Sequence, residues 1–163
     1  PGSKSLSNRY LILAALGSKP VTLIGLLRSR DTDLMMGALE ALGVRCDVDS
    51  ATDTTVTVTP PVSGRFHGNV NVFCGLAGTV MRFVPGLALF ADGPVNFDGD
   101  EQAYARPMKP VLDGLEQLGA TVDYHARLAV CRSLLRRLQP CRLPRRRSAS
   151  IRPVLPSSSP ACC

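Results

Sequence analysis

The sequence predicts an α/β fold made of two copies of one structural unit, and three observations support this prediction. Residues 38–43 (ALEALG) recur as residues 114–119 (GLEQLG), and residues 21–25 (VTLIG) recur as residues 95–99 (VNFDG). Each copy alternates helical and strand-like patterns, which is typical of α/β layers. The chain contains no apolar run as long as the roughly 18 residues that a membrane-spanning helix needs.

The first expected element is an amphipathic helix over residues 5–16, which the sequence at 17–20 (GSKP) ends. Its apolar positions follow helical spacing and are Leu6, Tyr10, Leu13, Ala14 and Leu16.

The rest of the first copy follows from turn residues and β-branched runs. Asp31, Thr32 and Asp33 can cap a second helix, which Gly43 ends. The other elements expected here are strands at residues 21–24, 44–48 and 55–59.

The second copy repeats this order. Pro107 suits the first turn of a helix, whereas Pro85 predicts a kink in the helix that contains it. The elements expected are a helix from about residue 79, a strand at 95–97, a helix at 107–118 and a strand at 120–124. The two units are expected at about 1–59 and 70–125.

The net charge of +6 combines two different compositions. Residues 1–125 carry ten Lys and Arg against thirteen Asp and Glu, a net charge of −3, whereas residues 126–163 carry nine Arg and no acid. The second stretch also lacks Gly and is rich in Pro, Ser and Cys, which predicts a disordered tail. Translation in a shifted frame would produce so abrupt a change, and sequencing the coding DNA tests that hypothesis.

The start of the first helix is a candidate anion site. Free N–H groups and the helix dipole favour an anion there, and Lys4 adds a charge. Ser5 offers a hydroxyl as a cap or a ligand, and Arg9, one turn later on the same face, can bind an oxyanion through two hydrogen bonds. The alternative is a capped helix with two solvated basic residues.

A second candidate site occupies the equivalent place in the second copy. Gly75 and Gly78 let the backbone approach a ligand closely. Thr79 can cap the helix that follows, and Arg82 lies three residues later. Two units would then present anion-binding helix starts to one cleft.

Arg106 is a third candidate, because the following proline restricts its backbone and its guanidinium could clamp a carboxylate or phosphate. The alternative is an exposed arginine that pairs with Asp98, Asp100 or Glu101.

The remaining candidates carry weaker signals. Cys46 and Cys74 lack metal-ligand spacing, which favours a reducing, cytoplasmic compartment, and Cys74 has no evident histidine partner for catalysis. The residues expected at the surface or in solvated turns are His67, His125, Asp47, Asp49 and Asp53.

Three segments together resemble the EPSP synthase family, the enolpyruvyl transferases that act on shikimate 3-phosphate. They are residues 1–9 (PGSKSLSNR), residues 77–82 (AGTVMR), and the stretch from Asp98-Gly99-Asp100 to Arg106-Pro107. Their order and spacing match the family over about residues 1–125.

The resemblance implies that the parent enzyme transfers the enolpyruvyl group of phosphoenolpyruvate to the 5-hydroxyl of shikimate 3-phosphate and releases phosphate. This is the step before chorismate in aromatic amino-acid biosynthesis. It implies no metal or organic cofactor, and a cytoplasmic protein that is monomeric at full length. It also implies βαβαββ units in an inverted α/β-barrel-like fold, of which this chain holds about two.

The resemblance assigns roles by position. Lys4 would contact both substrates, and Ser5 and Arg9 would hold shikimate 3-phosphate. The residues implied at or beside the phosphoenolpyruvate subsite, where glyphosate would compete, are Gly78, Thr79, Arg82 and Arg106. The proton-transfer residues would lie in a second domain absent from this chain, so the catalytic residues are unknown and the fragment alone is expected to be inactive.

Two departures concern this subsite: Leu76 stands where the family usually has Asn, and Phe83 stands where Pro is common. Three alternatives stay open. The related transferase that acts on UDP-N-acetylglucosamine usually has Asn in place of Ser5. The arginine-rich tail, with Arg145-Arg146-Arg147, could bind nucleic acid. The chain could also be a non-catalytic scaffold.

Overall fold

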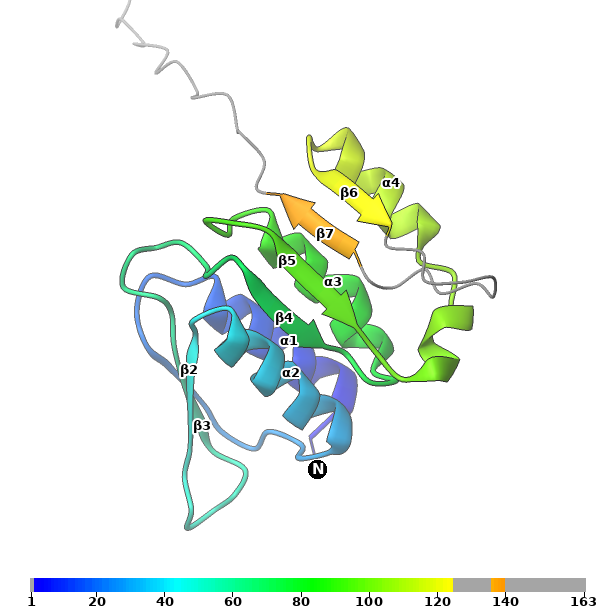
Figure 1. Ribbon diagram of the computed structural model, residues 1–163. Helices are drawn as coiled ribbons and strands as arrows, with labels where there is room; N and C mark the ends of the chain where they lie inside the picture. Colours follow the sequence, from blue (N-terminus) through cyan, green and yellow to red (C-terminus); the bar gives the residue numbers. More distant parts are fainter. Residues whose placement is uncertain (1, 125–135, 140–163) are drawn as a thin grey trace, which may run out of the picture.

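A computed structural model of the chain describes residues 2–124 and 136–139 (Figure 1). Its helices are α1 (Lys4–Ala15), α2 (Arg30–Ala41), α3 (Gly78–Ala88), the 3-10 helix η1 (Glu101–Ala105) and α4 (Lys109–Gln117). Its strands are β1 (Val21–Leu23), β2 (Arg45–Val48), β3 (Val56–Thr59), β4 (Val70–Phe73), β5 (Val95–Asp98), β6 (Thr121–Tyr124) and β7 (Arg136–Gln139).

The two halves of the chain repeat one sheet topology. The first sheet has the antiparallel order β1-β3-β2, and the second contains the matching antiparallel order β5-β7-β6. The second sheet also contains β4, which precedes α3 and pairs in parallel with β5. The second half therefore shows the complete βαβαββ order, which confirms the α/β class and the repeated unit.

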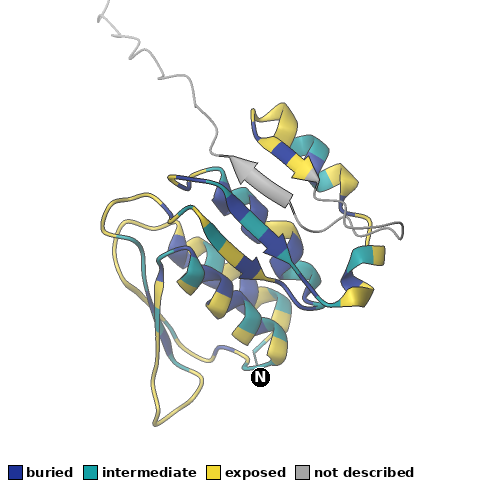
Figure 2. Cartoon of the chain, in the orientation of Figure 1, coloured by how far each residue is buried: buried dark blue, intermediate teal, exposed yellow. Residues whose placement is uncertain are grey.

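Helices from both halves pack together to form the core. α1, α2 and α3 contact one another, and α2 also contacts both β2 and β4 (Figure 1). Buried positions line the inner faces of these elements (Figure 2). The largest fully buried side chains are Leu11, Met35, Leu39, Leu42, Val56, Val58, Val72, Val80, Met81, Val84 and Val95. None of the helices in the described ranges is long and apolar enough to cross a membrane.

Helix α1 does not bury the apolar stripe that its sequence suggests. Its buried residues are Ser7, Asn8, Leu11, Ala14 and Ala15. Four of the five stripe residues, all except Ala14, are about half exposed or more: Leu6, Tyr10, Leu13 and Leu16. The helix turns its small and polar side toward α2 and α3, because small side chains allow the helices to approach closely.

Two strands were not expected from the sequence. The sequence prediction does not include β4, although its residues alternate: Val72 is buried and Phe73 is exposed, as in a strand with one buried face. Strand β7 lies inside the stretch expected to be a disordered tail, and it pairs with both β5 and β6. The other tail residues lie outside the described ranges.

Helix boundaries also differ from expectation. Helix α2 is capped by Ser29, since the Ser29 hydroxyl accepts from the Thr32 N–H and the Thr32 hydroxyl accepts from the Ser29 N–H; Asp31 and Asp33 lie in the first turn. Helix α4 begins at Lys109, two residues after Pro107. Helix α3 continues through Pro85 to Ala88, and the predicted kink stays a prediction.

Candidate functional site: an arginine cluster at two helix starts

The parallel pairing of β4 and β5 brings two loops together. Because parallel strands end at the same sheet edge, the segments after Phe73 and Asp98 leave the sheet side by side. The Cys74 N–H donates to the Asp98 carbonyl at 2.7 Å, and the Asp100 N–H donates to the Gly75 carbonyl at 3.3 Å. This contact places the turn at the start of α3 against the segment that carries Arg106.

Gly78 makes room for two guanidinium groups. A Cβ built on Gly78 would lie 2.8 Å from Nη1 of Arg106 and 3.2 Å from Nη1 of Arg82. Since Gly78 is the first residue of α3, the helix N-terminus adds partial positive charge at the same place. The structure therefore gathers three of the predicted residues around one point.

Among the described residues, the arginines of the candidate sites differ from several other arginines of the chain in that they form no ion pair with an acid. Within residues 2–124 and 136–139, no carboxylate pairs with Arg9, Arg82 or Arg106, which leaves their charges available to a ligand. Other arginines are neutralised by nearby acids, namely Arg28, Arg30 and Arg45.

The nearby acids that could have paired with Arg106 are engaged elsewhere. Asp98 accepts a hydrogen bond from the Tyr104 hydroxyl at 2.6 Å. Asp100 forms an ion pair with Arg30 at 2.8 Å, which also joins α2 of the first unit to the second unit. Within the described residues, Arg106 forms no ion pair with Asp98, Asp100 or Glu101, so the structure does not show the predicted alternative of an arginine paired with one of these acids.

The first helix start joins this cluster through Asn8. Its Nδ2 donates to the Thr79 hydroxyl at 2.6 Å, although the two residues are 71 positions apart. Asn8 is fully buried, and its Oδ1 has no partner within the described residues. Thr79 does not cap α3, because the N-cap is Ala77 and the Thr79 hydroxyl faces Asn8 instead.

The remaining residues of the first candidate site occupy the beginning of α1. Lys4 is exposed, and its Nζ lies 3.0 Å from a carboxylate oxygen of Asp31 in α2. Ser5 is half-buried in the first turn; the N-cap position is Ser3. One turn later, the Arg9 guanidinium carbon lies 6.0 Å from the centre of the Phe83 ring on α3.

Cys74 and Cys46 have the properties of structural thiols. Burial and the nearby Asp98 charge raise the pKa of Cys74 to about 12. Burial, with Glu40 and Asp47, raises the pKa of Cys46 to about 12 as well. Both thiols stay protonated at neutral pH, which argues against a nucleophilic role.

The other weak candidates are surface groups. His67 is exposed, Asp47 pairs with Arg45, and Asp53 pairs with Arg28. Asp49 accepts hydrogen bonds from Ala51 and Thr52 in its own turn. The described ranges contain no group of three or more His, Cys, Asp or Glu that could hold a metal ion, and His125 lies outside them.

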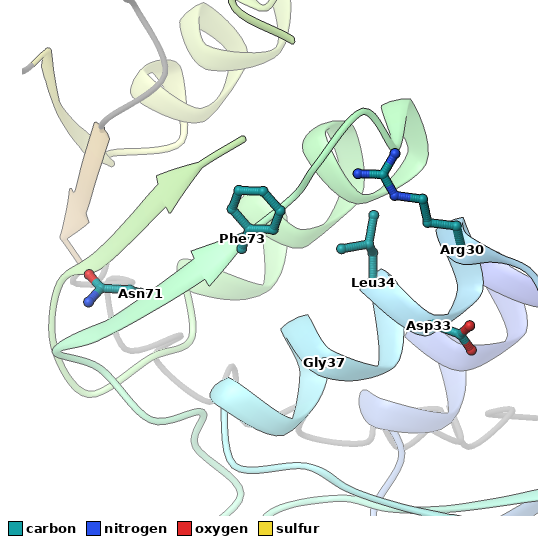
Figure 3. Close-up of a pocket in the computed structure, with 6 residues that line it drawn as sticks. All are labelled: Arg30, Asp33, Leu34, Gly37, Asn71 and Phe73. Carbon is teal, nitrogen blue, oxygen red and sulfur yellow. The ribbon is translucent and has the colours of Figure 1, made fainter. Parts of the chain in front are cut away.

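Two hollows border helices α2 and α1. One of about 620 Å³ lies between α2 and β4, with Leu34 and Phe73 on opposite sides (Figure 3). Another of about 290 Å³ lies beside the start of α1, and Ser3, Leu6 and Tyr10 contribute to its lining.

Sequence reasoning identified the arginines but missed the residue that joins them. Asn8 lies within the segment that carried the resemblance, yet nothing in its spacing shows that a polar side chain is fully buried there. One signal in the sequence could have indicated this. Helix α1 has one face of large apolar residues and another of small and polar residues, and only the second allows another helix to approach closely.

Comparisons with known proteins identify the family of the chain. The family model for EPSP synthase (3-phosphoshikimate 1-carboxyvinyltransferase) matches residues 1–139. A 3-phosphoshikimate 1-carboxyvinyltransferase from Mycobacterium ulcerans (strain Agy99) is 53% identical over 129 residues, which cover 76% of this chain and 28% of the relative. The chain thus spans well under half the length of that curated relative.

Solved structures show the same fold. Two structures of EPSP synthase from Acinetobacter baumannii each superpose with a TM-score of 0.73 at 21% identity. The matched region covers 86% of this chain and 31% of theirs. With the family model matching most of its length, the chain belongs to the EPSP synthase family.

Proposed function

We propose that this chain supplies substrate-binding residues for transfer of the enolpyruvyl group of phosphoenolpyruvate to the 5-hydroxyl of shikimate 3-phosphate, with release of phosphate. The observation that carries the proposal is the cluster of Arg82 and Arg106 around Gly78, joined through Thr79 and Asn8 to the helix that bears Arg9. Two anions held side by side repel each other, and fixed cations offset that repulsion.

The geometry suggests which residues bind each of the two substrates. Arg106, Arg82 and the amide groups at the start of α3 suit phosphoenolpyruvate. Lys4, Ser5 and Arg9 on α1 suit shikimate 3-phosphate, and Asp31 would release Lys4 as the ligand binds. Holding the two reactants together contributes much of the rate enhancement that such a site provides. No proton-transfer residue is assigned to this chain.

The whole protein is proposed to act in the cytoplasm as a monomer on small-molecule substrates. Two free thiols, Cys46 and Cys74, suit a reducing compartment. Within the described residues, Arg82 and Arg106 converge on Gly78, and this small positive site suits compact anions better than a nucleic-acid backbone.

Calorimetric titration of the 163-residue chain tests the proposal. We expect shikimate 3-phosphate to bind, UDP-N-acetylglucosamine not to bind, and Arg106→Gln to weaken phosphoenolpyruvate binding. Arg65→Gln is the matched control, because Arg65 is exposed and lies near the other end of α1. Equal effects of the two substitutions would contradict the proposal. A phosphate-release assay on the chain alone is expected to show no turnover.

A further inference from the structure

We propose that Phe83 is a positioning residue that holds the Arg9 guanidinium for an anionic group of its ligand. This inference rests on the proposed function only for the identity of that ligand. The contact itself rests on the structure, in which the Arg9 guanidinium carbon lies 6.0 Å from the centre of the Phe83 ring.

The packing of α1 on α3 sets up this contact. Thr79 and Phe83 are one turn apart on α3, so both face α1. The hydrogen bond of 2.6 Å from Asn8 to Thr79 fixes the two helices in relation to each other. Arg9 follows Asn8 directly and therefore emerges from α1 at the level of the Phe83 ring.

The type of partner matters for binding. A carboxylate beside Arg9 would occupy the N–H groups that an anionic ligand needs. An aromatic ring instead attracts the guanidinium through its π-face and takes no hydrogen bond from those N–H groups in the ring plane. Within the described residues no carboxylate pairs with Arg9, so the ring restricts this side chain without competing for its hydrogen bonds.

The position of Phe83 on the helix surface also supports a role outside the core. Its side chain is on the surface of α3 and is 37% exposed, so burial in the core does not account for an aromatic ring there. A proline at this position would present no π-face to the guanidinium, and leucine would offer apolar contact without the ring quadrupole.

The test compares Phe83→Leu, Phe83→Tyr and Phe83→Trp in the 163-residue chain. Nuclear magnetic resonance of the Arg9 Nε–H group reports the contact directly, because the ring current shifts the signal of a proton above the ring upfield. We expect the shift to disappear in Phe83→Leu and to persist in Phe83→Tyr and Phe83→Trp. An Arg9 signal that does not move in Phe83→Leu would overturn the proposal.

Titration with shikimate 3-phosphate measures the consequence. Phe83→Leu should weaken binding about two- to five-fold, the effect of one solvent-exposed cation–π contact, and the two aromatic variants should restore it. The affinity for phosphoenolpyruvate should not change, since Arg82 and Arg106 are placed at Gly78. In an Arg9→Met background, Phe83→Leu should have no further effect on shikimate 3-phosphate binding.

Controls separate this inference from the proposed function. Phe90→Leu changes another surface phenylalanine, 46% exposed, and should alter neither the Arg9 signal nor binding. If the unsubstituted chain binds no shikimate 3-phosphate, the proposed function fails, and the Arg9 signal still decides whether Phe83 positions the guanidinium. A loss of affinity for both ligands in Phe83→Leu would indicate a general structural effect and would contradict the positioning role.

Discussion

At the scale of single residues, the site depends on Gly78, which has no side chain. Gly78 has no need of unusual backbone angles, because its φ is not positive. Its role is to leave space, since a Cβ would lie 2.8 Å from Nη1 of Arg106 and the guanidinium would have to shift. The sequence could therefore suggest a close approach at this glycine but could not say what approaches it.

Gly78→Ala should weaken phosphoenolpyruvate binding on the order of tenfold, because a displaced charged hydrogen bond is worth about 1.5–3 kcal/mol. Calorimetric titration measures this change. Gly86→Ala is the control on the same helix, since a Cβ there would meet no atom within 4 Å. Equal binding by the two variants would show that the gap at residue 78 does not place the arginines.

Burial of Cys74 should make stability depend on pH in the alkaline range. The pKa of this thiol rises from the ordinary 9.0 to about 12 in the folded chain, so the unfolded chain loses its proton first. The free energy of unfolding should therefore fall as the pH rises from 9 towards 12. Urea denaturation at several pH values should show a smaller fall for Cys74→Ala; an identical fall would argue against this cause.

At the scale of elements, the sequence predicts helices better than their ends and faces. The order of helices and most strands follows from local periodicity. Strand β4 was missed because its partner β5 lies 25 residues further on and the pairing is parallel, so no local turn marks it. The buried face of α1 was misjudged because helix packing, which is not local, selected Ser7 and Asn8 over Leu6 and Tyr10.

The cap of α2 gives an element-level prediction. Ser29→Ala removes the hydroxyl that accepts from the Thr32 N–H at the helix start and should lower the free energy of unfolding by about 1 kcal/mol. Urea denaturation measures the loss. Ser50→Ala, in an exposed turn, should leave stability nearly unchanged. Similar losses in both variants would mean that the cap contributes little.

At the scale of the whole molecule, the exposed apolar face of α1 should control self-association. Leu6, Tyr10, Leu13 and Leu16 form this face, and contiguous exposed apolar surface favours association in water. Sedimentation velocity should show concentration-dependent association that Leu13→Lys reduces. Leu118→Lys is the matched control, since Leu118 and Leu13 are each 63% exposed but Leu118 is the C-cap residue of α4. Association that is insensitive to Leu13→Lys would exclude this face.

The hydrogen bond between Asn8 and Thr79 has an evolutionary consequence. Replacing either residue alone leaves a buried polar group without its partner, which costs about 1–3 kcal/mol. Replacing both with apolar side chains of matching shape avoids that cost. Substitutions at positions 8 and 79 should therefore covary among relatives, although the two positions are far apart in the sequence.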